Sequence, residues 1–156
     1  MNETAKASDL PTQDEKIMVA LAHVTVIWPM LGIVAPIVIW GTQREKSPFV
    51  RFQALQAAAY QFLFILGALV AGVCYMCSFF SIPFTTMFAI PFEEDAVALC
   101  IPFFTFSCTF GLLFLLMLFW LAYIGYGIFG AVSALQVRNF RYVFLGPWLE
   151  RYLEQT

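Results

Sequence analysis

The stretch that decides the fold reads LAHVTVIWPMLGIVAPIVIW, residues 21–40. It carries no acidic or strongly basic side chain, holds one imidazole at His23, and is interrupted by Pro29 and Pro36. A helix that is apolar all round has no face to turn toward water, so we expect hydrocarbon around it. Each proline removes a backbone donor, and in lipid the freed carbonyl must be bonded by a neighbour. The stretch therefore predicts a kinked membrane helix that packs against partners.

The whole chain shares this apolar character. Of its 156 residues, 62% are hydrophobic and 12% are charged, whereas a typical soluble domain has about 45–50% and about 25%. Its 18 phenylalanines exceed what the core of one small domain can hide from water. The net charge of −2 leaves no basic footprint for nucleic acid. We therefore expect the lipid bilayer as the main partner and no nucleic acid.

Three charge-free apolar runs are long enough to cross a bilayer. They cover residues 17–40, 54–80 and 103–137, and each exceeds the hydrocarbon thickness of ~30 Å at about 1.5 Å per residue. The predicted fold class is all-α, an integral membrane bundle of three transmembrane helices. A fourth, shorter element fits around residues 92–100. For the first run the alternative is a re-entrant hairpin kinked at Trp28-Pro29.

The remaining segments complete the domain organisation. Residues 1–11 are polar and predict a flexible tail before a helical membrane domain over residues 12–145. Thr12 and Glu15 match the S/T-x-x-E capping box, so the first helix is expected to begin there. Residues 146–156 predict a short interfacial helix, because Trp and Tyr favour the membrane boundary.

The placement of charge predicts the orientation. Basic residues lie in the first loop and after the third run, and the second loop carries only acidic ones. Cytoplasmic segments hold the positive excess, so we expect a multi-pass cell-membrane protein with its first loop and C-terminus in the cytoplasm. The basic residues are Arg44, Lys46, Arg51, Arg138, Arg141 and Arg151, and the acidic residues are Glu93, Glu94 and Asp95.

Of the polar residues within or beside the apolar runs, four are candidate functional positions, with Gln61 beside them: His23, Gln53, Gln56 and Tyr60. An ionisable group in a membrane is a functional candidate by default. A proton relay needs a second member, and the runs hold no acid, so a neutral His23 bonded to a nearby hydroxyl or carbonyl is favoured. Gln53, Gln56 and Tyr60 share one helix face, which either lines a polar groove or bonds across to a neighbouring helix.

The cysteines allow three interpretations. Free cysteine packs as a small apolar residue, two thiols form a disulfide on an oxidising face, and Cys-x-x-Cys pairs bind metal. Packing is favoured, because the spacing is not that of a zinc ribbon. The four residues are Cys74, Cys77, Cys100 and Cys108.

Several short motifs resemble those of a known family. Leu21-Ala22-His23, the Pro36–Trp40 segment, Ser47-Pro48-Phe49-Val50, Gln56-Ala57 and the stretch over residues 134–142 resemble a bacterial family of small membrane proteins, domain-of-unknown-function family 4870. The chain is similar, more distantly, to the Tic-twenty-like channel component of the plastid inner-envelope import machinery. The resemblance implies a multi-spanning membrane protein, and its plastid branch implies passage of polypeptides across a membrane.

These observations favour a non-enzymatic structural or translocation-associated membrane component. Small residues at 67, 68, 71 and 72 let helices approach closely, so a homo-oligomer or a membrane-protein partner is expected. The alternative is a small transporter or channel for ions or lipids. An enzyme is disfavoured because the spans hold no catalytic arrangement, and no catalytic residue, cofactor or metal ligand is predicted.

Overall fold

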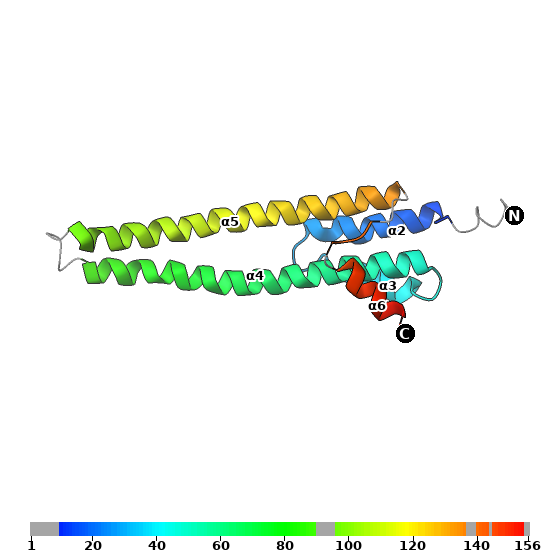
Figure 1. Cartoon of the computed structure of the whole chain (residues 1–156), viewed down its shortest axis with the longest axis horizontal. Helices are drawn as coiled ribbons and strands as arrows, with labels where there is room; N and C mark the ends of the chain where they lie inside the picture. Colours follow the sequence, from blue (N-terminus) through cyan, green and yellow to red (C-terminus); the bar gives the residue numbers. More distant parts are fainter. Residues whose placement is uncertain (1–9, 90–95, 137–139, 144, 155–156) are drawn as a thin grey trace, which may run out of the picture. The chain divides into compact units, whose positions relative to one another are not determined.

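The computed structural model describes residues 10–89, 96–136, 140–143 and 145–154, which form helices and turns without a strand (Figure 1). The all-helical class predicted from the sequence is confirmed. The helices are α2 (Gln13–Val24), the 3-10 turn η1 (Thr25–Ile27), α3 (Val34–Gln43), α4 (Pro48–Ala89), α5 (Ala96–Leu135) and α6 (Gly146–Glu154). The chain divides into two units. The first unit comprises residues 1–65 and 123–156, and the second unit comprises residues 66–122.

Helix α2 begins with the capping box that the sequence predicts. The Thr12 hydroxyl accepts from the Glu15 amide at 3.3 Å, and the Glu15 carboxylate accepts from the Thr12 amide at 2.7 Å. Hydrogen bonds from the Ser47 hydroxyl, and then from Thr12, hold the pKa of the Glu15 carboxyl below its ordinary value. The start of α2 therefore lies beside the residue that precedes α4.

The continuous helix expected over residues 17–40 does not form. Helix α2 ends at Val24, and α3 begins only at Val34 and packs back against α2. Pro29 has no amide to donate, and Met30 takes a φ of 71°, which is unusual for a residue with a side chain. The run folds into a helical hairpin broken at Trp28-Pro29, the arrangement that was the alternative.

The number of membrane spans differs accordingly. Pro48–Met87 and Cys100–Leu135 are the two described segments that are long and apolar enough to cross a membrane. The prediction of three transmembrane helices is therefore not confirmed. Within the described residues there is also no separate helix over 92–100, because α5 already begins at Ala96 and continues through Pro102. Residues 90–95 lie outside the described residues.

Unlike Pro29, Pro36 and Pro48 lie at the starts of helices. Pro36 is the third residue of α3, where an amide has no helical partner in any case, so it causes no kink. Pro48 opens α4, and the Ser47 hydroxyl before it accepts the Val50 amide at 3.3 Å. Serine followed by proline is a strong helix start, since the serine caps and the proline presets φ.

The first unit packs around small residues. Ala22 of α2 lies against Ala54 and Ala57 of α4, and all three are buried. On α5, a Cβ at Gly127 would lie 2.6 Å from Val26, and a Cβ at Gly130 would lie 2.9 Å from Phe140. These glycines are packing positions that let α2 and the C-terminal segment approach α5 closely.

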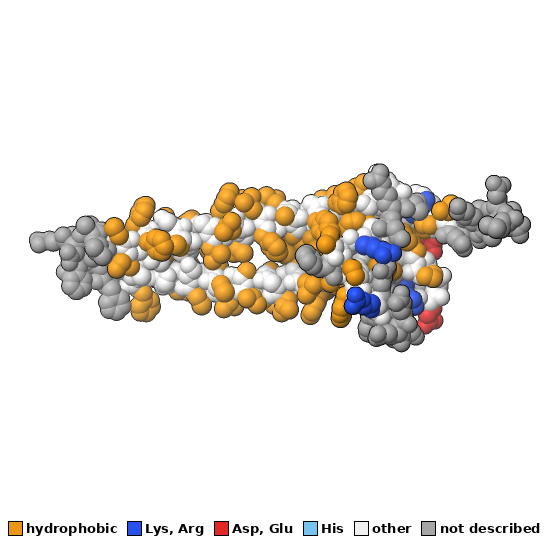
Figure 2. Space-filling view, in the orientation of Figure 1, with side chains coloured by type: hydrophobic (Ala, Val, Ile, Leu, Met, Phe, Trp, Pro, Cys, Tyr) orange, Lys and Arg blue, Asp and Glu red, His pale blue; other side chains and the backbone are white. Residues whose placement is uncertain are grey.

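The second unit holds no charged side chain among its described residues. Its parts of α4 and α5 expose most of their large apolar side chains, which cover these helices in Figure 2. Ser78 and the fully buried Thr109 join the two helices: their hydroxyls lie 2.9 Å apart, and the Thr109 hydroxyl lies 3.4 Å from the Ser78 carbonyl oxygen. A surface this apolar is suited to lipid rather than to water.

Gly32 is the residue on which the hairpin turn depends. A Cβ there would overlap the Thr25 carbonyl oxygen and lie 2.7 Å from that of Trp28. We expect Gly32→Ala to destabilise the protein by about 1–3 kcal/mol, because backbone atoms must shift. Denaturant unfolding in detergent measures the change.

Gly41→Ala is the matched control. Gly41 lies in α3, and a Cβ there would meet nothing within 4 Å. Alanine is favoured over glycine in a helix by up to about 1 kcal/mol, so this variant should be unchanged or slightly stabilised. Equal stability of the two variants would show that the turn does not need Gly32.

Candidate functional site

The polar residues of the first unit gather in one buried cluster. His23 comes from α2, Gln53 and Gln56 come from α4, and their solvent exposure is 1%, 1% and 0%. The segment after α5 also contributes to the cluster, through the buried residues Phe140 and Tyr142. The structure thus brings three of the four predicted polar residues together, with partners that the sequence did not indicate.

His23 is bonded on both ring nitrogens. Its Nδ1 lies 3.1 Å from the Tyr142 hydroxyl, and its Nε2 lies 3.3 Å from Gln53 Oε1. The Gln53 amide nitrogen donates to the Phe140 carbonyl at 2.9 Å, so its oxygen must be the atom that faces the imidazole. We therefore assign the proton of His23 to Nε2, which leaves Nδ1 to accept from Tyr142.

This arrangement keeps the imidazole neutral. His23 is 1% exposed, and a buried cation loses its hydration, so the neutral form is favoured. The described hydrogen-bond partners are a phenol and an amide, neither of which offsets a positive charge. These hydrogen bonds join α2 to α4 and to the segment after α5.

Gln56 reaches the same carbonyl from one turn further along α4. Its amide nitrogen lies 3.4 Å from the Phe140 oxygen, which thus accepts from both glutamines. Its own oxygen is buried and has no hydrogen-bond partner among the described residues. Together the two side chains fix the backbone of the segment that follows α5 onto α4.

Gln61, one turn beyond Gln56 on α4, bonds the end of α2. Its amide nitrogen donates to the Ala22 carbonyl at 3.2 Å and lies 3.3 Å from the Thr25 hydroxyl, which itself donates to Ala22 at 3.1 Å. The last carbonyls of a helix have no partner within it. The break at Pro29 was a signal that such carbonyls would need donors, but the sequence did not show which residue supplies them.

An aromatic stack continues the cluster along α4 and α5. The ring of Tyr60 lies 4.1 Å from that of Tyr142 and 5.0 Å from that of Tyr123, close to parallel with both. The Tyr60 hydroxyl donates to the Tyr123 carbonyl at 3.0 Å, and Phe64 stacks on Tyr123 at 3.6 Å. The contribution of Tyr142 was missed because it follows the last apolar run, where no periodicity indicates its direction.

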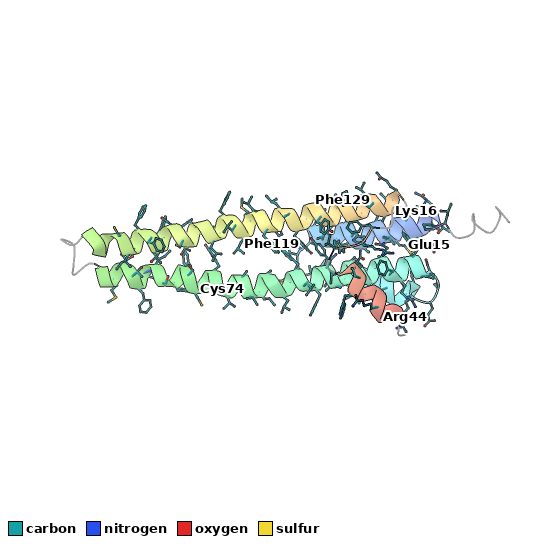
Figure 3. All side chains as sticks on the ribbon, viewed as in Figure 1. Glu15, Lys16, Arg44, Cys74, Phe119 and Phe129 are labelled. Carbon is teal, nitrogen blue, oxygen red and sulfur yellow. The ribbon has the colours of Figure 1, made fainter. Side chains whose placement is uncertain are left out.

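The four cysteines lie elsewhere. All of them are in the second unit, and each is free and exposed; Figure 3 labels Cys74 on α4. Within the described residues, no group of three metal-binding side chains forms. The sequence interpretation of these residues as packing thiols remains a prediction.

These features define a class. The described residues form helices, two of which are long and apolar enough to cross a bilayer, as in helical membrane proteins. Residues 14–149 match the magnetosome magnetite crystal formation protein family, MamF/MmsF. Since the match covers most of the chain, the protein belongs to that family. Neither the curated proteins nor the solved structures contain a match.

The resemblance to domain-of-unknown-function family 4870 and to the Tic-twenty-like import component is therefore wrong, because the family match is a different one. Its motifs lie at positions that the hairpin itself requires. His23 and Ala57 are core residues, Pro36 lies in the first turn of α3, and Ser47-Pro48 starts α4. Such residues indicate an architecture and do not distinguish one family from another.

Removing the Tyr142 hydroxyl tests the cluster. Tyr142→Phe keeps the ring stacking but leaves His23 Nδ1 buried without its donor, at a cost of about 1–3 kcal/mol. We expect a lower unfolding midpoint in detergent and faster proteolysis after α5. Tyr75→Phe, in the second unit, is the control with no hydroxyl bond among the described residues; an equal loss there would mean that the His23–Tyr142 bond is unimportant.

Proposed function

We propose that this protein is a membrane-embedded, non-enzymatic component of magnetite crystal formation. The observation that carries the proposal is the family match over residues 14–149. That range includes the whole buried cluster and both long helices. The protein would therefore act in a magnetosome membrane as a scaffold that presents its connecting segments to other components.

The geometry of the cluster supports a scaffold. His23 and Gln53 are almost completely buried, and their polar atoms bond to other parts of the same unit. A channel lined by Gln53, Gln56 and Tyr60 is less well supported, because these side chains bond to the backbone of Phe140 and Tyr123. We expect reconstituted vesicles to show no solute flux beyond that of protein-free vesicles.

The topology follows from two spans and a hairpin. If α4 and α5 each cross the membrane, the residues before α4 and after α5 share one face and the acidic residues 93–95 take the other. The basic residues Arg44, Lys46 and Arg51 mark the shared face as cytoplasmic. The hairpin returns to its starting face, so the N-terminus is cytoplasmic as well, in contrast to a three-span arrangement.

Single-cysteine labelling tests this topology. In a variant with Cys74, Cys77, Cys100 and Cys108 replaced by serine, new cysteines are placed at Asp14, Glu45, Glu94 and Glu150. We expect a membrane-impermeant reagent to label positions 14, 45 and 150 from the cytoplasmic face and position 94 only from the opposite face. Labelling of positions 14 and 45 from opposite faces would restore the three-span model.

Complementation tests the role in mineral formation. In a magnetite-forming bacterium that carries this gene, we expect deletion to change crystal size, shape or number in electron micrographs, and the wild-type gene to restore them. Tyr142→Phe should restore crystals in proportion to the amount of folded protein, because the cluster acts through the fold. Crystals unchanged by the deletion would contradict the proposal.

The triple variant Glu93→Gln, Glu94→Gln, Asp95→Asn distinguishes a scaffold that needs no charge from one whose carboxylates contribute to crystal formation. A pure scaffold needs no charge at this connection, so crystals should be restored fully when the variant is present at wild-type levels. Failure to restore crystals at equal protein levels would show that the carboxylates, and not the scaffold alone, contribute.

A further inference from the structure

The hairpin of α2 and α3 has half the length that a membrane crossing requires. These helices contain 12 and 10 residues, or about 18 Å and 15 Å at roughly 1.5 Å per residue. The hydrocarbon core is ~30 Å thick. A hairpin of this depth that starts at one membrane surface would reach the middle of the bilayer and return.

The charged side chains of the hairpin lie at the end opposite its turn, where α2 begins and α3 ends. Asp14, Glu15 and Lys16 lie in the first turn of α2, and Arg44 to Lys46 directly follow α3. Figure 3 shows Glu15, Lys16 and Arg44 at the same end of the first unit. Between these two charged groups the only ionisable side chain is His23, which faces the buried cluster. The other hydroxyl and amide side chains between these groups are Thr25, Thr42 and Gln43, and the Thr25 and Thr42 hydroxyls donate to carbonyls of the hairpin.

The outward face of the hairpin is apolar and uncovered within the first unit. At the turn, Trp28 is 64% exposed and Leu31 is 75% exposed. In water so many exposed apolar side chains would be unfavourable. The exposed large apolar residues of this face are Leu21, Ile27, Trp28, Met30, Leu31, Val34, Ile37 and Val38.

Several backbone amides at the turn donate to carbonyls of the turn itself. The amides of Trp28, Leu31 and Gly32 donate to Thr25, Pro29 and Trp28, and the amide of Val34 donates to Leu31. The Ala22 carbonyl is bonded by Gln61 and Thr25. Irregular backbone at membrane depth needs its polar groups satisfied by the protein, and these bonds supply that for the amides of Trp28, Leu31, Gly32 and Val34.

We propose that the acyl chains of a single leaflet cover the hairpin, and that this makes the protein select curved membranes. α4 and α5 cross both leaflets, whereas α2 and α3 add cross-section to one leaflet only. An insertion that expands one leaflet is favoured where that leaflet is convex, since its lipids are then spread apart. The preferred surface is a small vesicle with the hairpin in its outer leaflet.

The depth of Trp28 tests the placement in one leaflet. The variant Trp40→Phe, Trp120→Phe, Trp148→Phe leaves Trp28 as the single indole, and the full chain is reconstituted in phosphatidylcholine vesicles. We expect strongest quenching by lipids that carry the spin label near the end of the acyl chain. Stronger quenching by headgroup-labelled lipid or by aqueous iodide would place the turn at a surface and overturn the proposal.

Vesicle size tests the selectivity. Fluorescently labelled protein is reconstituted into a mixture of sonicated and large extruded vesicles of phosphatidylcholine and phosphatidylglycerol, and protein per lipid is measured on single vesicles. We expect protein density on the small vesicles to be at least about twofold higher, which corresponds to a partition difference of about 0.4 kcal/mol. Equal densities would overturn the proposal.

A variant at the turn links selectivity to the hairpin. Leu31→Lys places a charge where the mid-plane is expected, which is unfavourable there, and should abolish the enrichment. Leu31→Met is the apolar control and should keep it, with both variants compared at equal helix content. Enrichment retained in a folded Leu31→Lys protein would assign the selectivity to another part of the chain. These experiments contain no mineral, so their failure leaves the crystal-formation role intact.

Discussion

A helix that ends inside an apolar environment leaves carbonyls that no water can bond, and the first unit is organised by this constraint. α2 stops at Val24 because Pro29 and the turn around it cannot continue the helix. The freed carbonyl of Ala22 then needs donors, which Gln61 and Thr25 supply. An unbonded carbonyl in hydrocarbon costs several kcal/mol, so α4 must place Gln61 there for the break to persist.

The same logic explains the polar face of α4. Gln53 and Gln56 direct their amide nitrogens at the backbone of the segment after α5, and Gln61 directs its amide nitrogen at the last turn of α2. Because the side chains project from one rigid helix, α4 fixes both the end of α2 and the segment after α5. His23 and Tyr142 then complete the contact between those two segments. In the structure, Gln53 and Gln56 bond to the segment after α5, and the Tyr60 hydroxyl bonds to α5.

The sequence predicted the parts of this fold that depend on local chemistry. The capping box at Thr12, the helical class and the two long apolar helices follow from residue type and spacing. The first run was misjudged as a continuous helix because hydropathy and length do not tell a crossing helix from a hairpin of the same composition. Pro29 and Gly32 are the residues that indicate the break. That residue 32 must be glycine is apparent only from the structure, where the Thr25 carbonyl lies against it. Tyr142, a hydrogen-bond partner of His23, is 119 residues away in the sequence. No local sequence pattern reveals a contact over such a separation.

The lengths of α4 and α5 set a last limit on how the chain meets a membrane. From Phe52 to Ala89 α4 carries no charge, a length of about 57 Å that a tilt of about 40° reduces only to about 44 Å. One hydrocarbon core of ~30 Å cannot cover it. If the bilayer begins at Arg51, the charged residue that precedes this length, the excess falls toward Ala89. That part of the helix pair holds Ser78, Ser81, Thr85 and Thr109, whose hydroxyls bond to helix carbonyls or to each other. If α4 crosses a bilayer, part of its charge-free length must lie outside the hydrocarbon core, and serine and threonine hydroxyls can bond water there as well as helix carbonyls.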